Sequence, residues 1–270
     1  MQTRWEYLTP PEFKQLAKEH QICVLPIGSL ERHGNHLPYG TDGLAAHAIA
    51  LRASQIEPCV VFPTYWFGQV HEASLHAGAI NFPMDMLLNM LETLLDQIAH
   101  NGFRKIVILS GHGGNTHFLD YFAMSQSDRE VDYTLYLLKN QPGKHVKALG
   151  KHWETTAGHA GESETSVTMA VTPEGVVKMD QQIYPEPVLP KIDLAQELPG
   201  VSSGLWWYAM YPENVTESPA SATREKGELY VNARAQDVAE QLAAIKADTV
   251  VPALQQEFYT RLRGVRKLDW

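Results

Sequence analysis

Residues 22–42 of the 270-residue chain read ICVLPIGSLERHGNHLPYGTD. The first six residues are continuously apolar, which is typical of a β-strand buried on both faces of a sheet. The rest contains Glu31, His33, His36 and Asp42 among glycines and prolines, a mixture that favours neither helix nor strand. The stretch therefore predicts a buried strand followed by a loop that either is simply polar or forms one wall of a metal site.

The alternation of buried strands with helices extends along the whole chain. Further apolar runs predict strands at residues 59–62, 106–109 and 133–138. Helices are predicted at residues 9–20, from 43, at 85–100, from about 116, at 164–171 and from 222 to about 262. Because the strands are apolar on both faces, we predict an α/β fold of three layers, α/β/α, with a mostly parallel sheet.

The composition is that of an ordinary globular protein, with 44% hydrophobic and 20% charged residues. Its net charge of −9 argues against partners such as nucleic acid or an anionic membrane, since both require a basic surface. No apolar run approaches the ~18 residues of a membrane span, and the first residues do not resemble a signal peptide, so we expect a cytoplasmic protein. Cys23 and Cys59 lie in apolar runs and are expected to be buried rather than bonded to each other.

We expect a single domain over residues 1–270, with an irregular segment around residues 181–217. This segment is rich in proline, glycine and aromatic residues and has no clear periodicity, as in an insertion or a lid over a site. Its side chains from Trp206 to Tyr211 could line a pocket. They could equally pack in a subunit interface, where aromatic residues are also enriched.

Three polar segments carry side chains suited to catalysis or metal binding. Two of them, residues 28–42 and 110–115, follow predicted strands, and ligands of doubly wound sheets bind beyond the carboxyl ends of the strands. The third, residues 157–165, precedes a predicted helix. We therefore expect at least two of these segments to converge on one face of the sheet.

The residue types in the first segment are those of a metal site without cysteine. Glu31 and His33 would point the same way in an extended chain, and Asp42 follows a turn at Gly40. A mixed set of glutamate, histidine and aspartate suits Zn²⁺, Mn²⁺ or Fe²⁺, and an aspartate can bridge two cations. On spacing alone, a metal site and a solvated polar loop remain equal alternatives.

The chain resembles the creatininase family of metal-dependent amidohydrolases, whose signature reads roughly G-S-x-E-x-H-G-x-H-L-P-x-G-T-D. The corresponding run in this sequence is GSLERHGNHLPYGTD. Four later segments resemble family segments in the same order, namely EASLHAGAI, LSGHGGN, HAGESETS and PASATREKG. Five segments in register, spread over about residues 20–240, are far more specific than any one of them.

The resemblance implies a fold like that of creatininase and a centre of two divalent metal ions, Zn, Mn or Fe. Glu31 and His112 would bind one ion, His33 would bind the other, and Asp42 would bridge both. His36 would support these ligands without binding a metal.

The resemblance is less direct for the remaining metal ligand and for the residue that transfers protons. Creatininase itself completes the second site with a glutamate two residues after the loop histidine, where this chain has Gly114. Glu164 is our candidate for that ligand and Glu162 is the alternative, although either could merely complement a helix dipole. His159 would act as general acid and base, or else would only hydrogen-bond to a ligand.

The implied activity is hydrolysis of a C–N bond, in a cyclic amide or formamide, through a metal-bound hydroxide. Relatives that open a keto-sugar or keto-inositol ring at a C–C or C–O bond provide one alternative. A metal-binding subunit without catalytic activity provides another. The resemblance also suggests a homo-oligomer, as a hexamer, that acts on a small-molecule substrate.

Arg32 stands where the family commonly has glutamine. A cation beside the site could pair with an anionic group of the substrate, or could form a structural ion pair.

Overall fold

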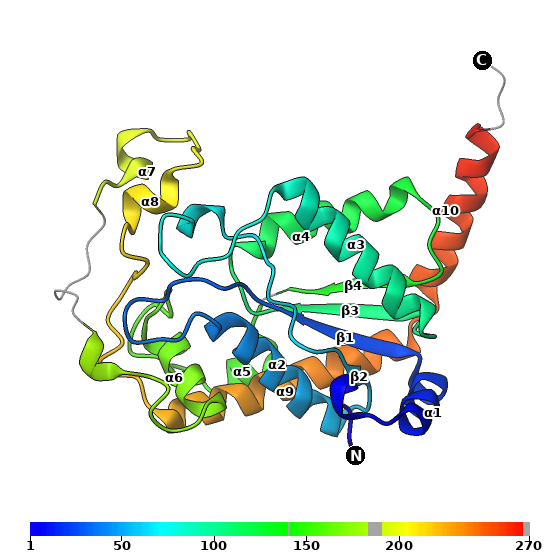
Figure 1. The fold of residues 1–270 in the computed structure, drawn as a ribbon, viewed down its shortest axis with the longest axis horizontal. Coiled ribbons are helices and arrows are strands. Elements are labelled where there is room, and N and C mark those ends of the chain that lie inside the picture. The colour runs from blue at the N-terminus through cyan, green and yellow to red at the C-terminus, as the bar shows by residue number, and fades with distance from the viewer. Residues whose placement is uncertain (140, 183–190, 267–270) are drawn as a thin grey trace.

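The fold is built on a four-stranded parallel sheet, as the sequence predicts (Figure 1). The computed structural model describes residues 1–139, 141–182 and 191–266. The strands lie in the spatial order β2-β1-β3-β4 and are β1 (Ile22–Ile27), β2 (Val60–Val61), β3 (Lys105–Ser110) and β4 (Thr134–Leu138). Because β1 and β3 pair along their whole lengths, the loops that follow them begin side by side.

The helices of the described residues include those that the sequence predicts, together with short helices that it does not predict. They are α1 (Pro10–His20), α2 (Thr41–Ile56), α3 (Met84–His100), α4 (Asn115–Ser125), α5 (Lys144–Ala148), α6 (Glu162–Val171), α7 (Leu194–Glu197), α8 (Trp206–Met210), α9 (Arg224–Ala247) and α10 (Val250–Arg266). The region from residue 222 to about 262 is mostly helical, as predicted, and it is divided into α9 and α10 because the chain becomes extended at Asp248. The Asp248 carboxylate then accepts a hydrogen bond from the backbone N–H of Val250 and starts α10.

Alternate residues of each strand face two different hydrophobic cores. Along β1, Cys23, Leu25 and Ile27 pack in a core with helices α1, α3 and α4, whereas Ile22 and Val24 pack in a core with α2, α6 and α9. Figure 1 accordingly shows α3 and α4 above the sheet and α2 and α9 below it. Burial on both faces is the reason why the strands are apolar throughout, and it confirms the predicted three-layer arrangement.

Both cysteines are buried and free, as predicted. No helix within the described ranges is both long enough and apolar enough to cross a membrane.

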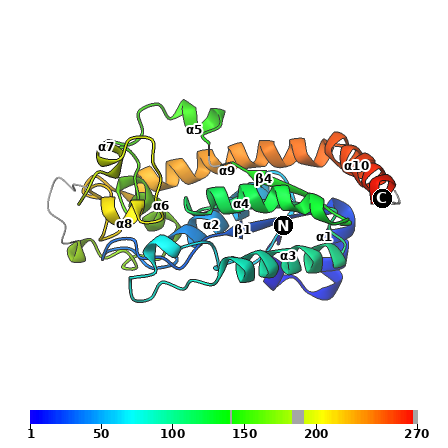
Figure 2. The same ribbon diagram turned by 90° about the horizontal axis from the view of Figure 1, so that it is seen from above.

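The irregular segment predicted at residues 181–217 is partly helical. Short helices α7 and α8 lie at the end of the molecule opposite α10 (Figure 2). Residues 183–190 of this segment lie outside the described residues. The role of the segment as a lid therefore stays a prediction, but α8 places its tryptophans next to the polar segments discussed below.

Candidate metal centre

The candidate ligands converge where the central strands end. Glu31 and His33 follow β1, His112 follows β3, and Asp42 lies in the first turn of α2. Two glycines permit this approach. A β-carbon on Gly28 would lie 2.3 Å from the backbone nitrogen of Gly43, and one on Gly111 would lie 2.2 Å from the Asp42 carbonyl oxygen. Only residues without a side chain let the amino end of α2 pack against both strand ends.

Asp42 stands between two histidines. Its Oδ1 lies 2.9 Å from Nε2 of His33, and its Oδ2 lies 2.9 Å from Nδ1 of His112. Glu31 Oε2 lies 3.1 Å from the same His112 nitrogen, and Glu164 Oε2 lies 3.6 Å from the same His33 nitrogen. Two groups of potential metal ligands therefore share Asp42, and within each group the ligand atoms lie within 4.8 Å of one another.

In both His33 and His112, one ring nitrogen contacts a backbone carbonyl oxygen and the other faces carboxylates. His112 Nε2 lies 2.7 Å from the Gln69 carbonyl oxygen, and His33 Nδ1 lies 3.1 Å from the Glu31 carbonyl oxygen. Since a carbonyl only accepts, these nitrogens carry the protons. The opposite nitrogen of a neutral ring then points a lone pair at carboxylate oxygens, which is repulsive unless a proton or a metal ion lies between them.

Burial and the neighbouring charges shift the pKa values of these side chains in opposite directions. Burial lowers the pKa of His33, but the Asp42 and Glu164 carboxylates outweigh it and raise that pKa to about 10. Burial likewise opposes the charged form of His112, yet Glu31 and Asp42 hold its pKa well above the ordinary value. Burial raises the pKa of Asp42, but His33 and His112 hold it well below the usual range.

One oxygen of a candidate ligand lacks a hydrogen-bond partner among the described residues. Glu31 is only 1% exposed, and no hydrogen bond of acceptable geometry from residues 1–139, 141–182 or 191–266 reaches its Oε2. A buried carboxylate oxygen in this condition is unfavourable. The residues thus fit a divalent cation in three ways: oxygen and nitrogen donors, lone pairs directed at one another, and an unsatisfied buried oxygen.

His159 lies over the centre on a strained loop. Its ring stacks on that of His33 with centroids 4.1 Å apart, and its Nε2 lies 3.2 Å from the Arg32 carbonyl oxygen. Ala157 and Ala160 on either side have left-handed φ values of 63° and 54°. Such backbone strain persists only where surrounding contacts impose it, and it is concentrated at functional sites.

Glu217 supplies the contacts that hold this loop. Its carboxylate accepts hydrogen bonds from the backbone N–H groups of Thr156 (3.0 Å) and Gly158 (2.8 Å), and from the Thr155 hydroxyl (2.7 Å). The loop that carries His159 is therefore anchored to the segment just before α9.

The two candidate glutamates of α6 have different surroundings. Glu162 is fully buried, forms a 2.5 Å ion pair with Lys226 and accepts a hydrogen bond from the Glu154 backbone N–H at 2.7 Å. Glu164 points to the other side, toward His33, and accepts a hydrogen bond from the Ala160 backbone N–H. Of these two glutamates, only Glu164 belongs to one of the groups of potential metal ligands found among the described residues.

The side chains of Arg32 and His36 form hydrogen bonds with residues that are not candidate ligands. The Arg32 guanidinium forms a 2.8 Å ion pair with Glu213 and a 2.9 Å hydrogen bond with Asn35. His36 is buried and lies 2.9 Å from the Thr165 hydroxyl, and burial together with His33 lowers its pKa to about 4. These contacts favour a structural ion pair for Arg32 and a supporting role for His36.

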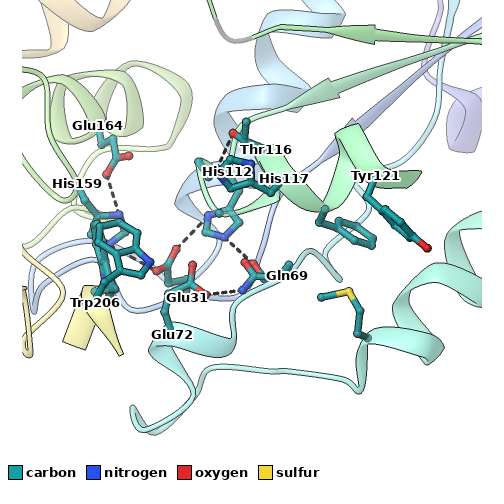
Figure 3. Close-up of a pocket in the computed structure, with 15 residues that line it drawn as sticks. Glu31, Gln69, Glu72, His112, Thr116, His117, Tyr121, His159, Glu164 and Trp206 are labelled. Atoms are coloured by element: carbon teal, nitrogen blue, oxygen red, sulfur yellow. Dashed lines mark hydrogen bonds and ion pairs between the residues drawn. The ribbon is translucent and has the colours of Figure 1, made fainter. Parts of the chain in front are cut away.

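The centre opens into a cavity of about 920 Å³. Figure 3 shows Glu31 and His112 at its middle, with Glu164, His159 and Trp206 on one side and Tyr121 on the other. Met84 and Phe118 add apolar side chains to the lining. The cavity therefore joins a charged end, suited to a metal-activated reaction, to an apolar end that can bind the rest of a substrate.

Comparison with known proteins decides the family. The model of the family described as creatinine amidohydrolase matches residues 6–242. The chain belongs to the creatininase family. It is therefore a hydrolase of that family, and the resemblance drawn from the five sequence segments is confirmed.

Curated relatives of the creatininase family align with most of the chain. A 3-dehydro-scyllo-inosose hydrolase of Thermotoga maritima is 25% identical, over 85% of this chain and 79% of the relative. A creatinine amidohydrolase of Pseudomonas putida is 25% identical, over 81% and 87% respectively. A mycofactocin precursor peptide peptidase of Mycolicibacterium smegmatis is 26% identical, over 80% and 81%.

Solved structures confirm the creatininase fold. A Bacteroides fragilis protein, provisionally named as a creatinine amidohydrolase, superposes with a TM-score of 0.77 at 26% identity, over 93% of this chain and 99% of that one. A structure named as the Mn form of creatininase superposes with a TM-score of 0.74 at 20% identity, over 92% and 100% respectively.

This creatininase-family site also contains residues to which the sequence assigned no role. Gln69 and Glu72 line the cavity, and the Gln69 amide donates a 2.5 Å hydrogen bond to the Glu72 carboxylate. Ser29 donates a 2.8 Å hydrogen bond to Asp42 Oδ2. Ser29 and Glu72 fall within the motifs themselves, which could have drawn attention to them, whereas Asn214, described below, has no comparable signal.

Proposed function

We propose that the protein is a dinuclear metal-dependent hydrolase that cleaves a C–N bond in a small amide. The observation that carries this proposal is the pair of ligand groups that share Asp42 at the charged end of the cavity. Each group directs a histidine nitrogen and carboxylate oxygens at one point, and each contains two or more buried side chains.

Two sets of residues would hold the ions. Glu31, Asp42 and His112 form the first set, and His33, Asp42 and Glu164 form the second. Two bound divalent ions lower the pKa of water and polarise a carbonyl oxygen, which is the chemistry that amide hydrolysis needs. Nitrogen and carboxylate donors suit Zn²⁺, Mn²⁺ and Fe²⁺, and the name of a structure of the same fold specifies a Mn form.

His159 is placed to move the proton that the leaving nitrogen requires. When its Nε2–H donates to the Arg32 carbonyl oxygen, its Nδ1 remains basic and lies 3.8 Å from Glu164 Oε2. The ring lines the cavity and is partly exposed. An imidazole in this position can take a proton and deliver it to a leaving group beside the centre.

The cavity favours a substrate without strong negative charge. Within the described part of the chain, its lining includes no lysine or arginine, whereas Glu72 adds a carboxylate. The apolar wall offers Met84, Phe118 and Tyr121 to the part of the substrate that does not react. A neutral cyclic or linear amide satisfies both conditions, and the creatinine and peptide hydrolases among the relatives are named for C–N cleavage.

A second candidate reaction is the opening of a keto-inositol ring. It is supported by the name of the Thermotoga maritima relative, which aligns with 85% of the chain. A neutral polyol ring also suits a lining without cationic side chains.

Metal analysis followed by a substrate panel tests both candidates. Purified protein should contain close to two divalent ions per chain, and one of three classes, cyclic amides, formamides or keto-inositols, should be hydrolysed only by the metal-loaded protein. Protein that takes up no Zn²⁺, Mn²⁺ or Fe²⁺ after careful reconstitution would remove the proposed mechanism.

A further inference from the structure

Asn214 is a buried residue that joins the candidate ligand Glu31 to helix α8. It is 1% exposed, and its Nδ2 donates hydrogen bonds to Glu31 Oε1 (3.0 Å) and to the Arg32 carbonyl oxygen (3.1 Å). Its Oδ1 accepts a 2.8 Å hydrogen bond from the indole Nε1–H of Trp207. Both amide protons and one lone pair of the oxygen are thus used in contacts with three different residues.

The backbone of Asn214 is equally constrained. Its φ is 52°, in the left-handed region that asparagine tolerates better than most residues. Its carbonyl accepts a 3.2 Å hydrogen bond from Gly34, and its N–H donates a 3.0 Å hydrogen bond to Tyr211, which follows α8. The residue therefore bonds through its backbone, as well as through its side chain, to the ligand loop on one side and to the end of α8 on the other.

Trp207 extends this connection to His159. The two rings meet edge to face with centroids 5.3 Å apart, and both line the cavity. One indole thus contacts the candidate proton-transfer group with its ring and Asn214 with its N–H. A continuous path of packed and hydrogen-bonded side chains runs from Glu31 through Asn214 and Trp207 to His159.

We propose that Asn214 is a positioning residue that couples metal binding at Glu31 to the placement of α8 on the cavity wall. Its amide holds Oε1 of Glu31, and this directs Oε2 toward His112. Outer hydrogen bonds of this kind orient ligands, and losing them commonly costs 10–100-fold in metal affinity. Because coupling is reciprocal, weakening the Trp207 contact must also weaken metal binding. This inference rests on the proposed metal-dependent function.

The test compares Mn²⁺ affinity, by isothermal titration calorimetry, in four variants of the full chain. Trp207→Phe removes the indole N–H, Asn214→Gly removes the amide at a φ that glycine adopts freely, and the double variant combines them. Trp206→Phe is the matched control, because it removes the same atoms from the adjacent residue of α8 and keeps an aromatic ring against Trp207, and no hydrogen bond of the Trp206 indole is found among the described residues.

We expect Trp207→Phe and Asn214→Gly each to weaken Mn²⁺ binding by about tenfold. The double variant should bind no more weakly than Asn214→Gly alone, since both changes act through one amide group. Trp206→Phe should keep the wild-type Mn²⁺ affinity. A wild-type affinity in Trp207→Phe, or fully additive losses in the double variant, would overturn the proposal.

Tryptophan fluorescence gives a readout that a purely structural role would not produce. Adding Mn²⁺ should change the emission of the wild type and of Trp206→Phe, and the change should be much smaller in Trp207→Phe. If Asn214→Gly does not fold, as judged by circular dichroism, the comparison of Trp207→Phe with Trp206→Phe still decides. If the wild type binds no metal, both this inference and the proposed function fail; if only Trp207→Phe behaves as wild type, this inference alone fails.

Discussion

The loop after β1 and the segment around α8 both reach the candidate centre, but the fold holds them in different ways. Residues 28–42 connect a fully buried strand to the first turn of α2, and glycine contacts lock that turn against two strand ends. The α8 segment meets the centre through the side chain and backbone of Asn214 and through the ring of Trp207. In the proposed centre, the first region would therefore supply ligands, and the second would position them.

The largest effect should follow from changing the residue that both ligand groups share. Asp42→Ala removes the carboxylate that lies 2.9 Å from each histidine, so we expect metal content to fall from two ions to nearly none and hydrolysis to stop. His33→Ala should remove mainly one ion. Inductively coupled plasma mass spectrometry measures both, with Asp85→Asn on the exposed start of α3 as control. An Asp42→Ala protein that keeps both ions would break the assignment of this loop as the ligand-bearing region.

The two glutamates of α6 provide the next comparison. Glu164→Gln should lose one ion and change the melting temperature little, because its side chain faces the cavity. Glu162→Gln should keep both ions and lower the melting temperature, because Lys226 then loses a fully buried carboxylate partner. Metal analysis and thermal unfolding of the pair distinguish the roles. If Glu162→Gln lost one ion and Glu164→Gln kept both, Glu162 would be assigned as the ligand in place of Glu164.

The number of protons released on metal binding tests whether metal ions replace the protons on His33 and His112, which follow the ends of β1 and β3. The carboxylates raise the pKa of His33 and His112, so we expect both imidazoles to be protonated at pH 7 in metal-free protein. We expect Mn²⁺ binding at that pH to release about two protons. Calorimetry in buffers of different ionisation enthalpy measures this number. A binding enthalpy that is independent of the buffer would contradict it.

The same pKa shifts predict the stability of the metal-free protein. A histidine whose pKa is raised on folding stabilises the fold fully below its unfolded pKa of ~6.5. For His33 that contribution should be lost as the pH rises toward about 10. Urea unfolding of chelated protein across this range measures the decline, which metal-loaded protein should not show.

The smallest effect should come from the anchor of the His159 loop. Glu217→Gln weakens four hydrogen bonds to residues 155–158 without touching a candidate ligand. We expect unchanged metal content, faster hydrogen exchange in that loop and a loss of activity of about tenfold. Glu174→Gln, at an exposed glutamate after α6, is the control. Equal exchange in both variants would show that Glu217 does not hold the loop.

The sequence alone determined the fold class and most of the candidate site. Strands buried on both faces are apolar throughout, so the continuous apolar runs predicted β1 and β3. The polar residues that follow these two parallel, neighbouring strands lie at one edge of the sheet. Family motifs then assigned Glu31, His33, Asp42 and His112 to that edge.

Only the tertiary structure separated Glu164 from Glu162 and found Asn214. Successive helical residues turn by about 100°, so Glu162 and Glu164, which are two positions apart on α6, point to nearly opposite sides of the helix. Local sequence does not reveal which side faces the core. Asn214 lies 183 positions from Glu31, in a segment without periodicity. A hydrogen bond over that separation depends on how the whole chain packs, and no local pattern encodes it.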